Sequence, residues 1–185
     1  MNNSFLAVLD RDGVINKDFG HVGKQQDFQF QPEIFDLCLE LQRRGAVIVV
    51  ATNQAGIAKG LYSENDFLEL TNWMTGCFLQ KGVHISRVYY CPHSYNPPAM
   101  KNGDELLLCG CRKPGPGMLR RALWDWGFTA ERALILGDQE SDQEAGQVAG
   151  FSKRIYLSKE TSRFATSSFP NIGAALDSIE TWAIR

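Results

Sequence analysis

The 185-residue sequence lacks the features that mark membrane, secreted and nucleic-acid-binding proteins. No apolar run approaches the roughly 18 residues that a membrane-spanning helix needs. The first residues, MNNSFLAVLDRDG, contain no basic segment of the kind that begins a signal peptide. No polybasic run stands out, and the net charge is −2. We therefore expect a cytoplasmic protein without a membrane or nucleic-acid partner.

Internal repeats, low-complexity segments and an obvious linker are also missing from the sequence. The length suits a single domain over residues 1–185, with one compact core. No heptad repeat or exposed apolar stripe indicates a partner subunit, so we expect a monomer. The five cysteines include no Cys-x-x-Cys pair, which argues against a redox site. In a cytoplasmic protein, clustered cysteines are better suited to metal binding than to disulfides.

What the sequence does contain is an alternation of short apolar runs and amphipathic segments. The runs predict buried strands at 5–10, 46–52, 87–91, 133–138 and 154–157. Helical spacing of apolar residues predicts helices near 34–41, 63–78, 119–126, 142–149 and 172–179. This alternation is typical of an α/β fold, a Rossmann-like three-layer sandwich with a parallel sheet. Ligands bind such sheets at the carboxyl ends of the strands.

Acidic residues follow two of the predicted strands. Asp10 ends the first strand and Asp12 lies just after it, whereas Asp138 ends the fourth strand, with Asp142 four residues later. Aspartate and glycine are also common in turns, so Asp-x-Asp-Gly alone would indicate no more than a turn. Together, Asp10, Asp138 and the backbone carbonyl of Asp12 offer the hard oxygen ligands that suit Mg²⁺. The sequence therefore predicts a magnesium site at the sheet edge.

Two further residues fit phosphate chemistry at the same edge. Thr52 ends the second predicted strand, and Lys113 lies in a loop before a proline. Their hydroxyl and ammonium groups could neutralise the oxygens of a transferring phosphoryl group. Asp10 could attack phosphorus to form an aspartyl phosphate. Asp12 could protonate the leaving oxygen and then deprotonate the hydrolytic water.

Four segments in order give the chain a resemblance to the haloacid dehalogenase-like phosphatases. They are DRDGVIN at 10–16, ATNQ at 51–54, CRKPGPGM at 111–118 and LGDQESD at 136–142. The resemblance implies the catalytic roles given above to Asp10, Asp12, Thr52 and Lys113, and it implies that Asp142 supports the metal shell. The intervals between the segments leave no room for a folded cap domain, so we expect loops to cover the site.

The stretch 91–111 holds a second group of candidate ligands. Cys91, His93, Cys109 and Cys111 form a Cys-x-His and Cys-x-Cys set with the ligand types of tetrahedral zinc. The alternative is chance clustering of buried cysteines. Four protein ligands would leave no open position for water, so such a zinc would be structural. We expect it to position the adjacent cations, Arg112 and Lys113.

This zinc loop, the capless length and the DRDGVIN opening resemble one branch of the family, the heptose 1,7-bisphosphate phosphatases and histidinol-phosphate phosphatases. The resemblance implies substrate contacts by Arg112 and by the loop residues Asp18, Phe19, Gly20 and His21. His21 could instead be an ordinary surface residue. Asn53 and Gln54 could contact phosphate or sugar, or could only satisfy loop backbone. The heptose enzymes tend to read His-Gly-Tyr where this chain reads Phe-Gly-His, and a lysine or arginine commonly stands where this chain has Gln139.

The resemblance implies one leading function, and two alternatives stay open. The leading expectation is an Mg²⁺-dependent phosphatase that removes the C7 phosphate of D-glycero-D-manno-heptose 1,7-bisphosphate, in the supply of nucleotide-activated heptose for bacterial surface polysaccharide. A histidinol-phosphate phosphatase would use the same catalytic residues. A non-enzymatic zinc-ribbon module is the alternative from another class. The loop between its cysteines carries Asp104 and Glu105 rather than a basic surface, which argues against it.

Overall fold

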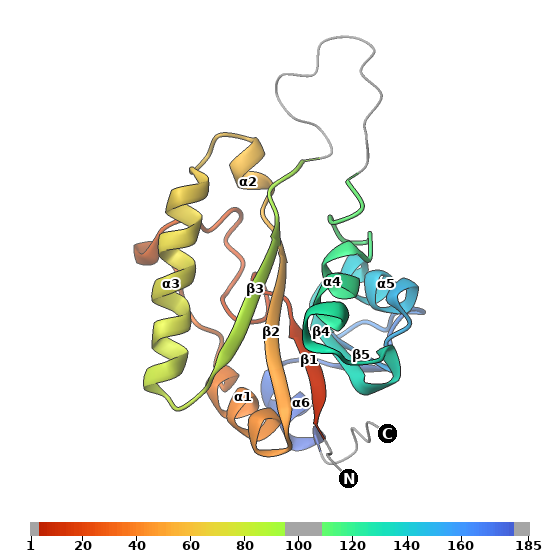
Figure 1. Ribbon diagram of the computed structural model, residues 1–185. Helices are drawn as coiled ribbons and strands as arrows, with labels where there is room; N and C mark the ends of the chain where they lie inside the picture. Colours follow the sequence, from red (N-terminus) through yellow and green to blue (C-terminus); the bar gives the residue numbers. More distant parts are fainter. Residues whose placement is uncertain (1–3, 95–108, 180–185) are drawn as a thin grey trace.

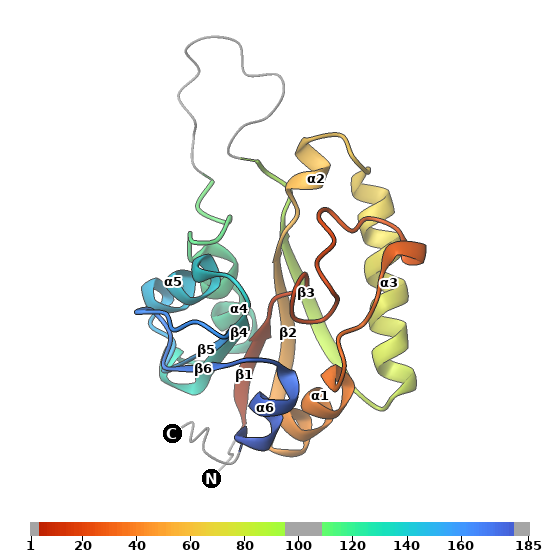
Figure 2. The same ribbon diagram turned by 180° about the vertical axis from the view of Figure 1, so that it is seen from behind.

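The chain forms a six-stranded parallel sheet with helices on both faces, here in a computed structural model (Figures 1 and 2). The structure describes residues 4–94 and 109–179. Every strand pairing is parallel, and the strand order is β3-β2-β1-β4-β5-β6. The strands are β1 (Phe5–Leu9), β2 (Ala46–Asn53), β3 (Ile85–Cys91), β4 (Ala133–Gly137), β5 (Lys153–Leu157) and β6 (Ser167–Phe169).

Helices form the outer two layers. One face of the sheet is covered by α1 (Ile34–Arg43), α3 (Glu64–Gln80) and α6 (Ile172–Asp177), and the other by α4 (Gly117–Trp126) and α5 (Glu140–Ala149). The short helix α2 (Ala55–Ala58) follows β2 at the upper end in Figure 1. Two 3₁₀ turns, η1 (Gln25–Asp27) and η2 (Ala130–Arg132), complete the set. None of the helices in the described parts of the chain has the length and apolarity that crossing a bilayer requires.

One apolar core lies on each side of the sheet, because side chains alternate between the two faces along each strand. In β1, Phe5, Ala7 and Leu9 face the α1–α3–α6 side, whereas Leu6 and Val8 face α4 and α5. All five are buried. Burial of one such leucine stabilises the fold by about 1.5–3 kcal/mol. A strand apolar at every position is therefore explained by helices on both faces.

Most of the predicted elements are confirmed, including the α/β class and the parallel sheet. Helix α3 begins with a reciprocal cap: Ser63 Oγ accepts from the Asp66 N–H at 3.1 Å, and Asp66 Oδ2 accepts from the Ser63 N–H at 2.7 Å. Helix α5 begins at Glu140, two residues before the predicted start. Besides the two 3₁₀ turns, one strand and one short α-helix were missed, β6 and α2. Their sequences, SSF and AGIA, are too short to show a hydrophobic period.

The strand order determines where a ligand site can form. The chain winds outward from β1 to β2 and β3, returns to the other side of β1 to form β4, and then continues to β5 and β6 in the opposite direction. The order therefore reverses between β1 and β4, and helices leave the sheet on opposite faces there. A crevice opens at the carboxyl ends of strands at such a point. Asp10 and Asp138 directly follow these two strands.

Candidate active site

A cavity of about 440 Å³ opens at the carboxyl ends of β1, β2 and β4. It brings together most of the predicted site residues, although Asp10 and Asp142 lie 132 residues apart in the sequence. The residues that line it are Asp10, Asp12, Asp18, Gly20, His21, Thr52, Asn53, Gln54, Ala55, Tyr62, Arg112, Lys113, Gln139, Ser141 and Asp142. Asp138 lines an adjoining cavity of about 590 Å³.

Three carboxylates lie close together beside these two cavities. One carboxylate oxygen from each of Asp10, Asp138 and Asp142 lies within 4.8 Å of the others. Burial and, to a smaller extent, the charges of Asp142 and Asp138 raise the pKa of Asp10 to about 8, against the opposing effect of Lys113. Burial and the charge of Asp142 raise the pKa of Asp138 to about 6. Like charges held this close in the interior require a compensating cation.

Lys113 supplies part of that compensation. Its Nζ lies 2.8 Å from Asp10 Oδ1 and 2.6 Å from Asp142 Oδ1, and it donates to the Ala51 carbonyl at 2.7 Å. The lysine is 2 % exposed. Burial alone would lower its pKa, but the two ion pairs outweigh burial, so the net shift of the Lys113 pKa is upward. Lys113 therefore stays charged where phosphate oxygens would arrive.

Asp138 is not neutralised in the same way. Its Oδ2 accepts from the Gln139 side chain at 3.0 Å, whereas its buried Oδ1 has no hydrogen-bond or ion-pair partner among residues 4–94 and 109–179. The backbone of Gly13 passes directly beside this carboxylate: a Cβ at Gly13 would lie 2.1 Å from Asp138 Oδ2. Gly13 also has a φ of 87°, which favours glycine. The DRDG turn thus approaches Asp138 closely because it carries no side chain there.

Asp12 is surrounded by hydrogen-bond donors. Arg11 Nη2 lies 2.8 and 2.9 Å from its two oxygens, Asn16 Nδ2 donates at 3.0 Å and Gln54 Nε2 donates at 2.9 Å. Arg11 is 1 % exposed and also donates to the Val22 carbonyl at 2.7 Å. The Asp12 side chain is not part of the three-carboxylate group. Its predicted part in metal binding, through the backbone carbonyl, stays a prediction.

The three residues at the end of β2 have distinct partners. Thr52 Oγ1 accepts from Gln54 Nε2 at 2.7 Å, which leaves its own proton available to a phosphate oxygen. Asn53 exchanges two 3.0 Å hydrogen bonds with the backbone of Lys113. Both amide side chains are therefore engaged within the protein, Asn53 with the Lys113 loop and Gln54 with Thr52 and Asp12. Their substrate contacts stay predictions.

The loop predicted to contact substrate lies partly at the cavity. Asp18, Gly20 and His21 line it, and Asp18 Oδ1 accepts from the Gly20 N–H at 2.8 Å. His21 has a left-handed φ of 54°, and its Nε2 lies 3.0 Å from the Lys59 ammonium. Phe19 is 59 % exposed and lines a neighbouring hollow instead. Its substrate contact stays a prediction.

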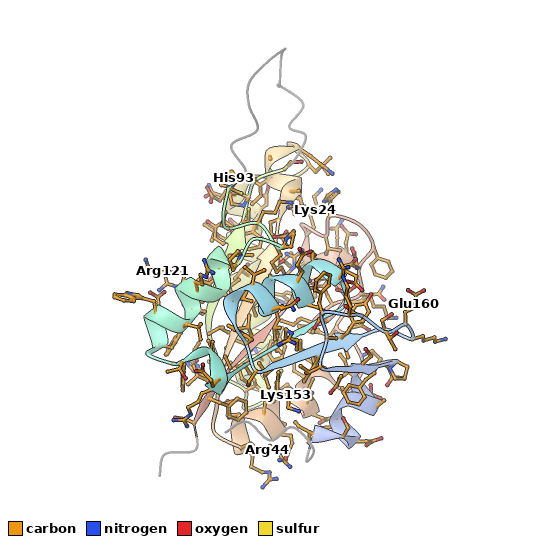
Figure 3. All side chains as sticks on the ribbon, turned by 90° about the vertical axis from the view of Figure 1, so that its right-hand side faces the viewer. Lys24, Arg44, His93, Arg121, Lys153 and Glu160 are labelled. Carbon is orange, nitrogen blue, oxygen red and sulfur yellow. The ribbon has the colours of Figure 1, made fainter. Side chains whose placement is uncertain are left out.

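The predicted zinc ligands form a compact group at the end of β3. Cys91 Sγ lies 3.5 Å from His93 Nδ1, 3.5 Å from Cys109 Sγ and 3.2 Å from Cys111 Sγ, and all three cysteines are free thiols. Ligands around tetrahedral zinc stand about 3.5–3.8 Å apart, given the usual bond lengths. Burial raises the pKa of Cys91, a cost that a bound cation would offset. In Figure 3, His93 lies near the upper end of the molecule, far from Arg44 at the lower end.

The backbone joins this group to the cavity. The Arg112 N–H donates to the Cys109 carbonyl at 3.3 Å, and Arg112 Nη1 donates to the His93 carbonyl at 3.1 Å. Arg112 also lines the cavity, and Lys113 follows it directly. These contacts connect Arg112 to the cysteine–histidine group, and the positioning of the two cations by that group stays a prediction.

Sequence reasoning missed two residues of the site, Arg11 and Tyr62. Arg11 carried a usable signal, because a cation between two aspartates at a strand end is available to pair with one of them. Tyr62 carried none, since it stands eight residues after Gln54 in a segment without a motif. Its hydroxyl donates to Gln54 Oε1 at 2.6 Å.

The fold, the carboxylate cluster and the buried lysine define the class of haloacid dehalogenase-like phosphatases. The sequence profile of the HAD-hydrolase-like family matches residues 110–179. A curated relative, D-glycero-beta-D-manno-heptose-1,7-bisphosphate 7-phosphatase from Vibrio cholerae, is 41 % identical over 82 % of this chain and 80 % of its own. The D-glycero-alpha-D-manno-heptose-1,7-bisphosphate 7-phosphatase of Burkholderia mallei is 40 % identical over 91 % and 87 %.

The solved structures that resemble this chain include a heptose bisphosphate phosphatase. The crystal structure of a D,D-heptose 1,7-bisphosphate phosphatase from B. bronchiseptica, complexed with magnesium and phosphate, superposes with a TM-score of 0.82. It is 25 % identical and covers 97 % of this chain and 99 % of its own. The chain therefore belongs to the family of the D-glycero-D-manno-heptose 1,7-bisphosphate 7-phosphatases.

Proposed function

We propose that this protein is an Mg²⁺-dependent phosphatase that removes the C7 phosphate of D-glycero-D-manno-heptose 1,7-bisphosphate. The observation that carries the proposal is the convergence of Asp10, Asp12 and Lys113 in one cavity, in a chain about 40 % identical to enzymes named for this reaction. The relatives include enzymes named for the alpha and for the beta anomer. An assay with both anomers decides which one this protein prefers.

Asp10, Asp138 and Asp142 fit a divalent cation. They offer three carboxylates within ligand distance of one another, and Asp138 Oδ1 is buried without a partner in the described parts of the chain. Hard oxygen donors of this kind suit Mg²⁺. The relative from B. bronchiseptica was solved with magnesium and phosphate. When bound, the ion would offset the repulsion between the Asp10 carboxylate and an incoming phosphate dianion.

The reaction then proceeds through Asp10. A carboxylate oxygen of Asp10 attacks phosphorus, forming an aspartyl phosphate as the bond to the leaving oxygen breaks. Asp12 gives a proton to that oxygen, so the sugar departs as an alcohol. Water next attacks phosphorus and gives its proton to Asp12, which releases inorganic phosphate and restores Asp10. Lys113 and the Thr52 hydroxyl stabilise the phosphoryl oxygens in both steps.

We also propose that Cys91, His93, Cys109 and Cys111 bind one structural zinc ion. Support comes from the soft and borderline donor set and from separations of 3.2–3.5 Å within the group. Arg112, which the group contacts, would contact the sugar or its second phosphate. For the whole chain we keep the proposals of a single domain and a monomer, which size-exclusion chromatography with light scattering tests.

A substrate panel tests the proposed activity. The panel holds both anomers of heptose 1,7-bisphosphate, fructose 1,6-bisphosphate and histidinol phosphate, each assayed with and without Mg²⁺. We expect the highest kcat/KM for one heptose anomer, with loss of the C7 rather than the C1 phosphorus signal by NMR. Turnover of histidinol phosphate alone would contradict the heptose assignment. An absence of metal-dependent turnover with every substrate would contradict a phosphatase altogether.

A further inference from the structure

Tyr62 is buried beside the cavity in a position that few side chains could take. It is 8 % exposed, and its ring lies between two glycine backbones. A Cβ on Gly23 would lie 2.3 Å from the ring, and a Cβ on Gly56 would lie 2.4 Å from it. The ring therefore fills the space between the loop after β1 and helix α2, and its hydroxyl is held in a fixed place.

The hydroxyl forms a hydrogen bond with one side chain among the described residues. Tyr62 Oη donates to Gln54 Oε1 at 2.6 Å. Burial raises the pKa of Tyr62, so the hydroxyl keeps its proton and remains a donor. The nitrogen end of the same amide donates to Asp12 Oδ2 at 2.9 Å and to Thr52 Oγ1 at 2.7 Å. Both amide protons of Gln54 are thus directed at groups that act on the phosphate.

The hydroxyl decides which way the Gln54 amide faces. If the amide turned over, its oxygen would face the Asp12 carboxylate, and two acceptors would meet without a proton between them. The Tyr62 hydroxyl occupies the oxygen end and stabilises the productive orientation. Gln54 is 1 % exposed, so water is not available to satisfy a turned amide. Removal of the hydroxyl would leave a buried carbonyl without its donor.

We propose that Tyr62 is a positioning residue for the reaction, which acts through the Gln54 amide on the carboxylate of Asp12. This inference rests on the proposed function, in which Asp12 is the general acid. Arg11 and Asn16 also hold Asp12, so loss of the Tyr62 hydroxyl displaces the carboxylate only in part. Loss of the hydroxyl should therefore cause a moderate fall in kcat/KM. The fall should be larger for a leaving group that needs a proton.

The test compares two leaving groups. A sugar alkoxide must be protonated as it departs, whereas p-nitrophenolate departs without a proton. For Tyr62→Phe we expect kcat/KM to fall by about 3–10-fold with heptose 1,7-bisphosphate, in line with the loss of one hydrogen bond. With p-nitrophenyl phosphate we expect a change of less than about 2-fold. A merely structural role of Tyr62 would lower kcat/KM by the same factor for both substrates.

Tyr89→Phe is the matched control. Tyr89 is equally buried, and its hydroxyl donates to Asp125 at 2.9 Å on the opposite face of the sheet. We expect no change of kcat/KM with either substrate. If Tyr62→Phe behaves like this control, or lowers kcat/KM equally for both substrates, the positioning role is wrong. If the wild-type enzyme shows no metal-dependent turnover of either substrate, the proposed function itself has failed.

A double-mutant cycle tests the path through Gln54. Gln54→Met has a similar volume but neither donates to Asp12 nor accepts from Tyr62. On its own it should show the same dependence on leaving group, which keeps the test open if Tyr62→Phe folds poorly. In the Gln54→Met background, Tyr62→Phe should have no further effect on kcat/KM. An equal loss in both backgrounds would show that Tyr62 does not act through Gln54.

Discussion

The ammonium of Lys113 lies 2.8 Å from the carboxylate of Asp10, and both groups are almost fully buried. The pair joins the proposed nucleophile to the loop that leaves the cysteine–histidine group. It also explains how Asp10 is held among other carboxylates, because Lys113 contacts Asp142 as well, at 2.6 Å. We propose that this one cation contributes both to folding and to phosphate binding.

Replacing Lys113 should therefore affect activity and stability together. For Lys113→Met we expect kcat/KM to fall by about 10²–10³-fold, the usual effect of removing one group that stabilises transition-state charge. Two buried carboxylates would also lose their partner, so the free energy of unfolding should decrease. Lys153→Met is the control, since Lys153 begins β5 at the opposite end of the sheet. Equal kcat/KM values for the two variants would contradict the role of Lys113.

Asp12→Asn removes the proposed general acid and leaves the proposed nucleophile, Asp10, in place. Asparagine keeps the shape of the side chain but cannot give a proton, so we expect kcat/KM with the sugar phosphate to fall by about 10²–10⁴-fold. The loss should be smaller with p-nitrophenyl phosphate, whose leaving group needs no proton. A loss of equal size with both substrates would assign Asp12 to phosphate binding instead.

The pKa values of the carboxylates predict how stability depends on pH when Mg²⁺ is absent. Burial raises the pKa of Asp10 to about 8 and of Asp138 to about 6, from an ordinary value of 3.8. Between pH 4 and 8 the folded protein therefore holds protons that the unfolded chain has released. The contribution of these groups to the free energy of unfolding is greatest near pH 4 and falls as pH rises toward 8.

Denaturant unfolding in Mg²⁺-free buffer without a chelator measures this dependence, since a chelator could also remove zinc. Asp10→Asn should flatten the decline between pH 5 and 8, and Mg²⁺ should restore wild-type stability most at pH 8. Asp177→Asn is the control, because Asp177 is exposed at the end of α6. A decline of the same slope in Asp10→Asn would contradict the raised pKa.

Removal of one proposed zinc ligand should lower the stability of the fold more than it lowers the affinity for Mg²⁺. We expect purified protein to hold one zinc equivalent by elemental analysis and Cys109→Ser to lose it. Because metal binding contributes to folding free energy, the melting temperature should drop by roughly 10 °C. The Mg²⁺ concentration for half-maximal activity should change far less. Cys77→Ser, a half-buried cysteine of α3 outside the group, is the control. Zinc-free wild-type protein would contradict the assignment.

The sequence predicted the parts of this site that obey a rule of topology or ligand chemistry. Asp10 and Asp138 follow strands with a clear apolar signature, and parallel strands bring their carboxyl ends together. The four zinc-ligand candidates were recognisable from residue type and spacing alone. The structure brings these four side chains together, with distances of 3.2–3.5 Å from Cys91 Sγ, and their binding of zinc stays a prediction.

Other features could not be predicted, because they depend on how side chains meet in three dimensions. The sequence offered Gln54 as a substrate contact, yet its amide is shared among Tyr62, Asp12 and Thr52. Nothing in the local sequence of Tyr62 indicates that its ring fills the gap between Gly23 and Gly56. The strand β6 was missed because it is short and only half-buried.

The covalent step through Asp10 is the centre of this account, and trapping it is the most direct test. Enzyme mixed with heptose 1,7-bisphosphate and Mg²⁺ is quenched with acid during turnover, reduced with borohydride and examined by peptide mass spectrometry. Borohydride converts an aspartyl phosphate to homoserine, so the account predicts this conversion at Asp10, absent without substrate. Conversion at another residue, or Asp10→Asn turning over at nearly the wild-type rate, would contradict it.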